Sequence, residues 1–233
     1  MKSRIWELDA ARGLALLGMI GIHLIYDLVD LFGVIPWQQP VWYLTFKNNY
    51  GLLFLVISGI SVTLGSRCVK RGFQVFCCGF LCTGATLGMY LLGIADSSIL
   101  IYFGVLHCLG ACMMLWPVFR RLPTPALAVL GAVLAAAGLY LRTVAFPFRW
   151  GMPLGFAYYG FASSDYFPLM PNLGYFLLGA SLGRRLYPRK ESRFPVEKVP
   201  APFLCWCGRH SLLIYLLHQP VLAAAVAGIA ALS

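Results

Sequence analysis

The stretch LDAARGLALLGMIGIHLIYDLVDLFG, residues 8–33, is long and apolar enough to cross a bilayer as one α-helix. It nevertheless carries five ionisable residues, namely Asp9, Arg12, His23, Asp27 and Asp30. At about 100° per residue, these positions project within an arc of roughly 60°, which predicts one polar stripe along the helix. Ionisable side chains in a membrane span usually face a protein interior or a hydrated cavity, so the stripe indicates a functional site.

Within this stripe, Arg12 and His23 share nearly the same helix face and lie about 16 Å apart along the axis. Asp27 follows His23 by one turn. We therefore expect the Asp27 carboxylate to accept a hydrogen bond from His23, which fixes the imidazole tautomer and raises its basicity, as a general base requires. The alternative is that these side chains only join the helix to its neighbours. An arginine, a histidine and three aspartates on one line favour a site.

The composition is that of a membrane protein. Hydrophobic residues make up 60% of the chain, charged residues 11%, and the mean hydropathy is +0.78. These values predict an all-α, polytopic helical membrane bundle. Asp9 and Arg12 interrupt the first apolar run, and no small-residue cleavage pattern follows it. We therefore expect this helix to remain in place rather than to be removed as a signal peptide.

Seven apolar segments have about the length of a membrane span, roughly 17–25 residues. They cover residues 8–30, 50–66, 72–94, 99–118, 126–142, 168–184 and 208–231. Residues 143–167 are long enough for a re-entrant turn or an eighth helix, and periodicity alone leaves that open. We expect about seven or eight transmembrane helices. Since no fixed repeat or low-complexity tail occurs, one domain over residues 1–233 is the economical interpretation.

Basic residues predict the orientation, because cytoplasmic loops carry an excess of Lys and Arg. With a cytoplasmic N-terminus, the outer loops hold only Lys47, Arg142 and Arg149. The inner loops and segment ends then hold Lys2, Arg4, Arg67, Lys70, Arg71, Arg120, Arg121, Arg184, Arg185, Arg189, Lys190, Arg193, Lys198 and Arg209. The net charge of +10 is thus mainly a topology signal, although a basic rim can also attract anionic lipid or polyphosphate. Because the charges are dispersed, they predict no nucleic-acid partner.

The eight cysteines predict neither a disulfide framework nor a metal site. None falls in a predicted outer loop. The Cys78/Cys82 and Cys205/Cys207 spacings have no matching Cys or His pair on a nearby loop, as a zinc site would need. We expect these residues to fill packing positions.

Three of the four histidines are predicted to lie at a similar depth. His23, His107 and His218 each fall in the middle third of a span when residues are counted at about 1.5 Å each across ~30 Å of hydrocarbon. Ser211 and Tyr215 share a helix face with His218 through i, i+4, i+7 spacing. A lone membrane histidine is more often a packing residue, but three at one level favour a buried polar site.

The two predicted outer loops are rich in aromatic and polar residues. Residues 34–49 include Trp37, and residues 143–167 include Asp165. Aromatic residues at this level most often form an interfacial belt. Flat aromatic faces beside amide and carboxylate groups also suit a carbohydrate, whose ring pairs an apolar face with hydroxyl edges. Both interpretations stay open at this point.

Four motifs follow one another along nearly the whole chain. They are Arg4, Glu7, Leu8, Asp9, Arg12 and Gly13 followed by His23, then GVLHCLG at 104–110, DYFPLMPNLGYFLLGASLG at 165–183 and GRHSLLIYLLHQP at 208–220. Together they resemble the heparan-α-glucosaminide N-acetyltransferase catalytic domain family, including its small bacterial members. The spacing from Arg12 to His23 is also similar to the signature of the wider transmembrane acyltransferase group.

This resemblance implies an integral, multi-pass enzyme of the bacterial plasma membrane. It would move an acyl group, expected to be acetyl, from cytoplasmic acyl-CoA to a hydroxyl or amine of an extracytoplasmic glycan. Acetyl-CoA would be the acyl-donor co-substrate, with no metal. Its partners would be acyl-CoA, a carbohydrate acceptor and membrane lipid, with a homodimer as an option. The short chain favours an envelope or exopolysaccharide sugar over heparan sulfate as acceptor.

The resemblance also implies residue roles. His23 is expected to be catalytic, together with Asp27. The acyl-CoA side would comprise Arg12, Asp9, Arg209 and His107, and the acceptor side His218, Tyr215, Ser211, Asp165 and Trp37. Two routes stay open: an acyl group resting on His23, or removal of the acceptor's proton by His23.

A proton-coupled transporter is the alternative function. Intramembrane carboxylates and histidines also mark proton paths, so the polar stripe fits that class as well. Against it, the sequence contains no inverted repeat and no paired broken helices, which many transporters carry.

Overall fold

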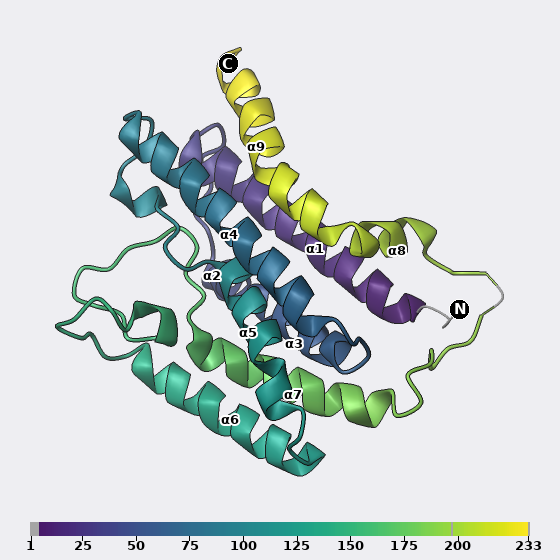
Figure 1. Ribbon diagram of the computed structural model, residues 1–233. Helices are drawn as coiled ribbons and strands as arrows, with labels where there is room; N and C mark the ends of the chain where they lie inside the picture. Colours follow the sequence, from purple (N-terminus) through teal and green to yellow (C-terminus); the bar gives the residue numbers. More distant parts are fainter. Residues whose placement is uncertain (1–4, 197, 233) are drawn as a thin grey trace. The chain divides into compact units, whose positions relative to one another are not determined.

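The computed structural model describes residues 5–196 and 198–232, and most of that length is helical (Figure 1). The α-helices are α1 (Trp6–Tyr26), α2 (Val41–Asn49), α3 (Gly51–Val62), α4 (Cys68–Leu91), α5 (Val105–Phe119), α6 (Thr124–Leu141), α7 (Leu169–Leu186), α8 (Pro202–Arg209) and α9 (Ser211–Ala230). A π-helical turn η1 (Asp27–Leu31) and two 3-10 turns, η2 (Ser97–Ile99) and η3 (Met152–Leu154), complete the set. The predicted all-α class is confirmed. Lys2 and Arg4, used above for the orientation, lie outside the described residues.

Each of the seven predicted spans corresponds to a helix, but their lengths differ. Among the described residues, four stretches are long and apolar enough to cross a membrane: α1 with η1, α4, α6 and α9. α3 has 12 residues and α5 has 15, so at about 1.5 Å per residue both are shorter than the ~30 Å hydrocarbon core. The chain is thus a helical membrane protein in which some helices are shorter than the predicted spans.

Two elements differ from the sequence-based expectation. The outer loop predicted at residues 34–49 contains α2, a helix of nine residues. The last predicted span, at 208–231, is broken at His210, which separates α8 from α9. Both α2 and α8 are too short to produce a clear hydrophobic period, which explains why the sequence did not reveal them.

The chain divides into two compact units, and the first combines an N-terminal and a C-terminal segment. It contains Met1–Phe54 and Glu191–Ser233, whereas the second contains Leu55–Lys190. The first unit therefore holds α1, η1, α2, α8 and α9, and the second holds α4 to α7.

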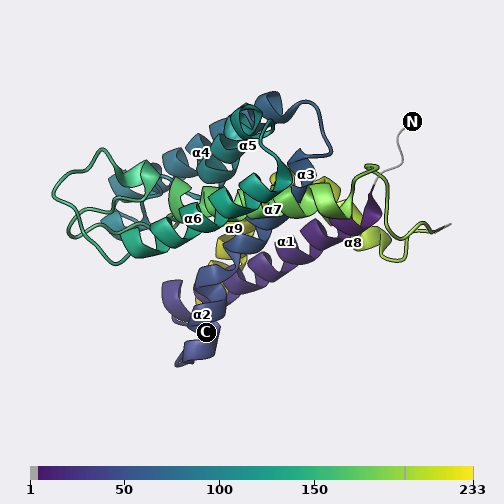
Figure 2. The ribbon, with the colours of Figure 1, turned by 90° about the horizontal axis from the view of Figure 1, so that it is seen from below.

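In the first unit, α1 and α8 lie side by side at very short range (Figure 2). A Cβ atom on Gly13 would overlap the carbonyl oxygen of Leu204, and one on Gly208 would overlap that of Asp9. Small residues that let helix backbones approach in this way are typical of membrane helix contacts. Because both positions lack a side chain, the start of α1 is held directly against α8. The adjoining core contains Leu16, Met19 and Cys207.

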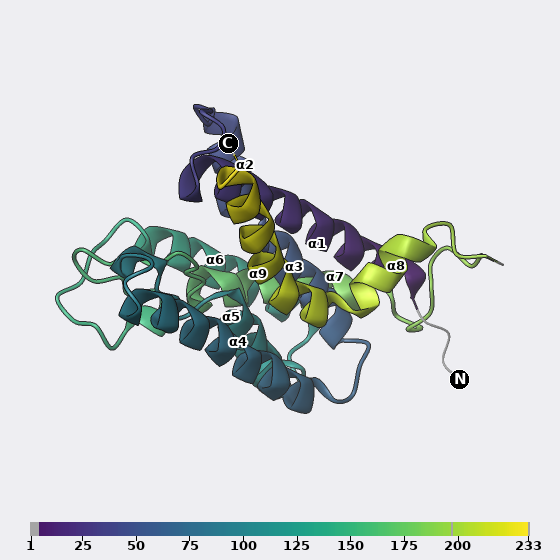
Figure 3. The ribbon, with the colours of Figure 1, turned by 90° about the horizontal axis from the view of Figure 1, so that it is seen from above.

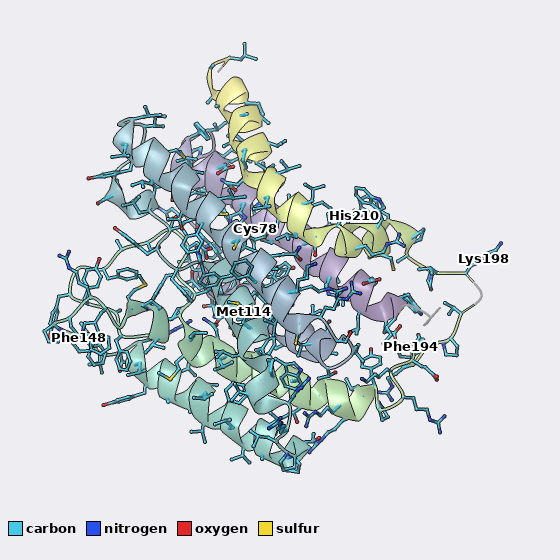
Figure 4. The ribbon with its side chains drawn as sticks, viewed as in Figure 1. Cys78, Met114, Phe148, Phe194, Lys198 and His210 are labelled. Carbon is cyan, nitrogen blue, oxygen red and sulfur yellow. The ribbon has the colours of Figure 1, made fainter. Side chains whose placement is uncertain are left out.

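The segment before α8 is fastened to the first turn of α1. The indole Nε1 of Trp6 donates to the carbonyl oxygen of Phe194 at 2.8 Å, and Figure 4 labels Phe194 in this segment. The carboxylate of Glu7 accepts from the Ser192 hydroxyl and from the backbone N–H of Arg193, both at 2.8 Å. Glu7, part of the first motif, therefore has a structural role here.

In the second unit, α6 packs along α7 and α4 packs along α5 (Figures 1 and 3). Glycines again set the spacing: a Cβ on Gly110 would lie 2.6 Å from the carbonyl oxygen of Gly72. The segment 143–167, described throughout, holds the single 3-10 turn η3 and no eighth helix. Its last residues dock on the chain before α5, where the hydroxyls of Ser163 and Ser164 donate to the carbonyl oxygens of Leu100 and Ile99.

Candidate active site

The polar stripe of α1 changes direction at Asp27, where the α-helix becomes the π-helical turn η1. The backbone N–H of Phe32 donates to the carbonyl oxygen of Asp27 at 2.9 Å, an i to i+5 bond. Such single π-turns inside α-helices are rare and occur frequently at functional sites. The wider turn rotates the residues that follow it, so a stripe predicted at 100° per residue does not continue beyond Asp27.

Asp30 shows this rotation and corrects the prediction that it belongs to the stripe. It is exposed, and its carboxylate accepts from Gln39 at 2.9 Å and from Lys47 at 3.3 Å. Lys47 in turn lies over the ring of Tyr26, 5.2 Å from its centroid. Asp30 therefore anchors the segment around α2 to the end of α1.

His23 of α1 and His218 of α9 are hydrogen-bonded to each other. The Nδ1 atom of His23 lies 2.8 Å from the Nε2 atom of His218, and the ring centroids are 4.8 Å apart. The Nδ1 atom of His218 contacts the carbonyl oxygen of Tyr215, one turn earlier on α9. His218 is buried, whereas His23 is partly exposed. The predicted convergence of these two histidines is therefore present in the first unit.

This chain of contacts fixes where the protons lie. A backbone carbonyl can only accept, so the Nδ1 atom of His218 must carry a proton. In a neutral imidazole its Nε2 atom is then an acceptor, and His23 must donate to it through Nδ1. The Nε2 atom of His23 consequently keeps a lone pair. That arrangement presents a base or nucleophile whose tautomer is set by its neighbour.

Asp27 has a different partner from the predicted one. Its Oδ1 atom accepts from Nε2 of Gln219 at 2.8 Å, and its side chain is 0% exposed. The prediction that Asp27 accepts a hydrogen bond from His23 is wrong. Two adjacent residues of α9 explain the difference, because His218 takes the imidazole and Gln219 takes the carboxylate. Sequence spacing along α1 alone contains no information about these partners.

Arg12, Asp9 and Arg209 gather where α1 meets α8. Nη1 of Arg12 lies 2.7 Å from Oδ1 of Asp9, in a partly buried ion pair. Gly208 packs on the backbone of Asp9, which places the adjacent, exposed Arg209 beside the same turn. Three residues predicted for the acyl-CoA side thus occupy one region of the first unit.

The remaining predicted residues of the first unit lie on α9 or near α2. Ser211 begins α9, and the Tyr215 ring lies 5.3 Å from that of His218. Trp37 packs against the ring of Tyr43 at 5.0 Å and is partly exposed. Gln219 was missed by the sequence reasoning, although a lone amide inside an apolar span, directly after His218, is a usable signal.

His107 and Asp165 belong to the second unit. His107 is 2% exposed and enclosed by three aromatic rings. Those rings are Phe76, Phe80 and Phe103, with centroids 5.0–5.6 Å away. Its Nδ1 atom accepts from the backbone N–H of Gly104 at 3.3 Å. This enclosure favours a role in fixing the start of α5 against α4.

Asp165, in the segment 143–167, caps the N-terminal end of α5. Its Oδ2 atom accepts from the backbone N–H of Val105 at 3.0 Å, one of the N–H groups that a helix start leaves without a partner. Burial raises the pKa of the Asp165 carboxyl to about 6, and the hydrogen bond from Val105 opposes part of that rise. In the same segment, the rings of Phe148 and Trp150 stack with centroids 4.6 Å apart, and Figure 4 labels Phe148.

Comparison with known proteins identifies the family. A family profile described as "Heparan-alpha-glucosaminide N-acetyltransferase, catalytic" matches residues 4–220. The chain belongs to this family. The match includes both units and all four motifs, so the resemblance inferred from the motifs is confirmed. Neither the search of curated proteins nor that of solved structures finds a significant match.

Membership in the heparan-α-glucosaminide N-acetyltransferase catalytic family makes the chain a membrane enzyme of the acetyltransferase type. Its N-terminal motif contributes Asp9, Arg12 and His23 to the first unit, and its C-terminal motif contributes His218 and Gln219. The first and last motifs of the family match are therefore the two sides of the paired-histidine site.

Proposed function

We propose that this chain transfers an acetyl group from cytoplasmic acetyl-CoA to a hydroxyl or amine of an extracytoplasmic glycan, with His23 as the general base. The observation that carries the proposal is the bond between His23 Nδ1 and His218 Nε2, which leaves the second nitrogen of His23 able to accept a proton. An imidazole held in one tautomer, with a free lone pair, is what general-base catalysis of acyl transfer requires.

The proposed step balances as follows. The acceptor X–H loses its proton to Nε2 of His23 while X attacks the thioester carbonyl carbon. The C–S bond breaks, CoA leaves as a thiolate, and the imidazolium returns the proton to that sulfur. The products are the acetylated acceptor and CoA-SH. His218 acts through His23 as a positioning residue, because its own proton is engaged by the carbonyl of Tyr215.

The acyl-CoA side is proposed at the start of α1, on the cytoplasmic side of His23. Arg12 would bind a phosphate or the pantetheine end, since a guanidinium forms strong paired hydrogen bonds with phosphate oxygens. Asp9 orients Arg12 through their 2.7 Å contact, and the exposed Arg209 adds a second cation there. Arg12 precedes His23 by about 16 Å of helix, a separation that an extended pantetheine arm can bridge.

The acceptor side is proposed at the opposite, outer end of α1. Trp37 offers a partly exposed indole on the segment that follows α1. Tyr215 and Ser211 precede His218 on α9 and lie on the Arg209 side of the histidine pair, so this acceptor surface does not include them. An envelope or exopolysaccharide sugar of a bacterial plasma membrane is the acceptor class that fits. Amino sugars are included, because the family name describes N-acetylation of a glucosaminide.

The test uses purified protein in liposomes, with radiolabelled acetyl-CoA outside and glucosamine inside. The proposal expects CoA thiol to be released in equal amount to acetylated sugar, and both to require acetyl-CoA and glucosamine together. Liposomes without protein are the control. Absence of CoA release would contradict the proposal, as would an uptake driven by a pH gradient without any covalent acetylation, which the transporter alternative predicts.

A further inference from the structure

Next to the paired histidines, Asp27 and Gln219 form a second contact between the end of α1 and α9. Their hydrogen bond of 2.8 Å runs from the amide Nε2 of Gln219 to Oδ1 of Asp27. Asp27 follows His23 by four positions, about 6 Å along the helix axis, and Gln219 directly follows His218. The two contacts between α1 and α9 are therefore one helical turn apart, and we call each of them a rung. The rung formed by Asp27 and Gln219 lies on the predicted outer side of His23.

Two oxygen atoms of this rung lack a hydrogen-bond donor. Oδ2 of Asp27 and Oε1 of Gln219 are buried, and no described residue donates to either. A buried carboxylate that receives one neutral amide hydrogen bond is costly, because its remaining lone pairs lose their contacts with water. The Asp27–Gln219 pair therefore offers two hydrogen-bond acceptors beside His23, and a ligand with hydrogen-bond donors would satisfy them.

We propose that Asp27 and Gln219 form the subsite that holds the sugar acceptor, by accepting hydrogen bonds from hydroxyl or amino groups adjacent to the group that reacts. This inference rests on the proposed function and adds to it the residues that select the acceptor. A monosaccharide carries neighbouring donors on a rigid ring, and its width is similar to the separation of the two rungs. One ring can therefore contact the Asp27 rung while its reacting group meets His23.

The same chemistry separates the acceptor from the acyl donor. The acetyl thioester group presents a carbonyl oxygen and a sulfur, with no N–H or O–H of its own. The oxygens of Asp27 and Gln219 would repel that carbonyl. The rung thus discriminates between the two substrates and keeps the sugar, rather than the thioester, on the outer side of His23.

The experiment measures glucosamine binding to the full chain in nanodiscs, without acetyl-CoA, by equilibrium dialysis. Gln219→Met keeps the side-chain length but removes the amide, and it should raise the dissociation constant for glucosamine about tenfold or more. Gln74→Met is the matched control, because Gln74 is an exposed glutamine of α4 in the second unit. It should leave binding unchanged. If Gln219→Met does not fold, Asp27→Asn takes its place, with Asp96→Asn, an exposed aspartate of the second unit, as its control.

Failure of the wild-type protein to bind glucosamine would contradict the proposed subsite. The two buried oxygens would then be assigned to contacts with bound water. Equal binding by Gln219→Met and Gln74→Met would overturn it as well. The proposed function is tested separately, by measuring acetyl transfer. Binding without transfer contradicts the proposed function and leaves the subsite standing, whereas transfer with unchanged binding in Gln219→Met removes the subsite alone.

Discussion

The Nδ1 atom of His23 lies 2.8 Å from the Nε2 atom of His218, across the contact between α1 and α9. This relationship joins the first and the last family motifs, 195 positions apart in the chain. Because the Tyr215 carbonyl fixes the proton on His218, a backbone atom of α9 determines which nitrogen of His23 is basic. A residue that the sequence suggested for acceptor binding thereby gains a positioning role.

Replacing His218 should impair catalysis more than substrate binding. His218→Gln removes the imidazole that orients His23, so kcat is expected to fall by about 10²-fold, with the KM for acetyl-CoA changed by less than about twofold. Steady-state kinetics of the reconstituted protein measure both. His210→Gln is the control, since His210 is an exposed histidine between α8 and α9 (Figure 4). An unchanged kcat in His218→Gln would remove His218 from the mechanism.

Replacing Arg12 should act on the acyl donor. Arg12→Ala removes a cation from the start of α1, and we expect the KM for acetyl-CoA to rise about tenfold or more, with a smaller effect on the KM for glucosamine. Arg185→Ala, which removes an exposed arginine at the end of α7, serves as the control. Equal weakening of both substrates by Arg12→Ala would count against an acyl-CoA contact at this position.

The glycine contact between α1 and α8 predicts a stability difference within one helix. Gly13→Ala or Gly208→Ala places a methyl group on a backbone carbonyl of the other helix, which should destabilise the fold by about 1–3 kcal/mol. Gly21→Ala, with open space around its Cβ, should be neutral or stabilising by up to ~1 kcal/mol, because alanine favours helix. Thermal unfolding in detergent measures all three, and a Gly13→Ala melting curve equal to that of Gly21→Ala would refute the close contact.

The carboxyl of Asp165 predicts a pH dependence of stability. Its pKa in the folded protein is about 6, above the usual aspartate value of 3.8. The folded state therefore holds more protons than the unfolded state between these values, and the contribution of Asp165 to stability falls as the pH rises from about 4 to about 6. In Asp165→Asn, which still offers an oxygen to Val105, this part of the pH dependence should vanish. Melting temperatures that follow the same pH curve in both proteins would contradict the assignment.

Much of the helical framework could be predicted from the sequence, because long apolar segments report their length directly. That His23 and His218 meet could also be predicted, since helix rise converts residue number into position along each helix. The partner of Asp27 could not. The partner of Asp27 depends on which residues of α9 face α1, and on a π-helical turn that helix periodicity does not predict.

His107 illustrates a second limit of sequence reasoning. Its expected depth in the membrane is similar to that of the other histidines, but depth does not give the lateral position of a residue within a helical bundle. In the structure it belongs to the second unit and packs among the rings of Phe76, Phe80 and Phe103. Aromatic residues spaced along α4 were the available signal, and only tertiary packing shows that they enclose an imidazole.

The most direct test of His23 as the general base compares His23→Ala with His210→Ala in acetyl transfer from acetyl-CoA to glucosamine, after their circular dichroism and melting curves are matched to wild type. We predict that His23→Ala loses at least about a hundredfold in rate, whereas His210→Ala keeps the wild-type rate. Transfer that persists at the wild-type rate in folded His23→Ala would contradict the assignment of His23 as the base.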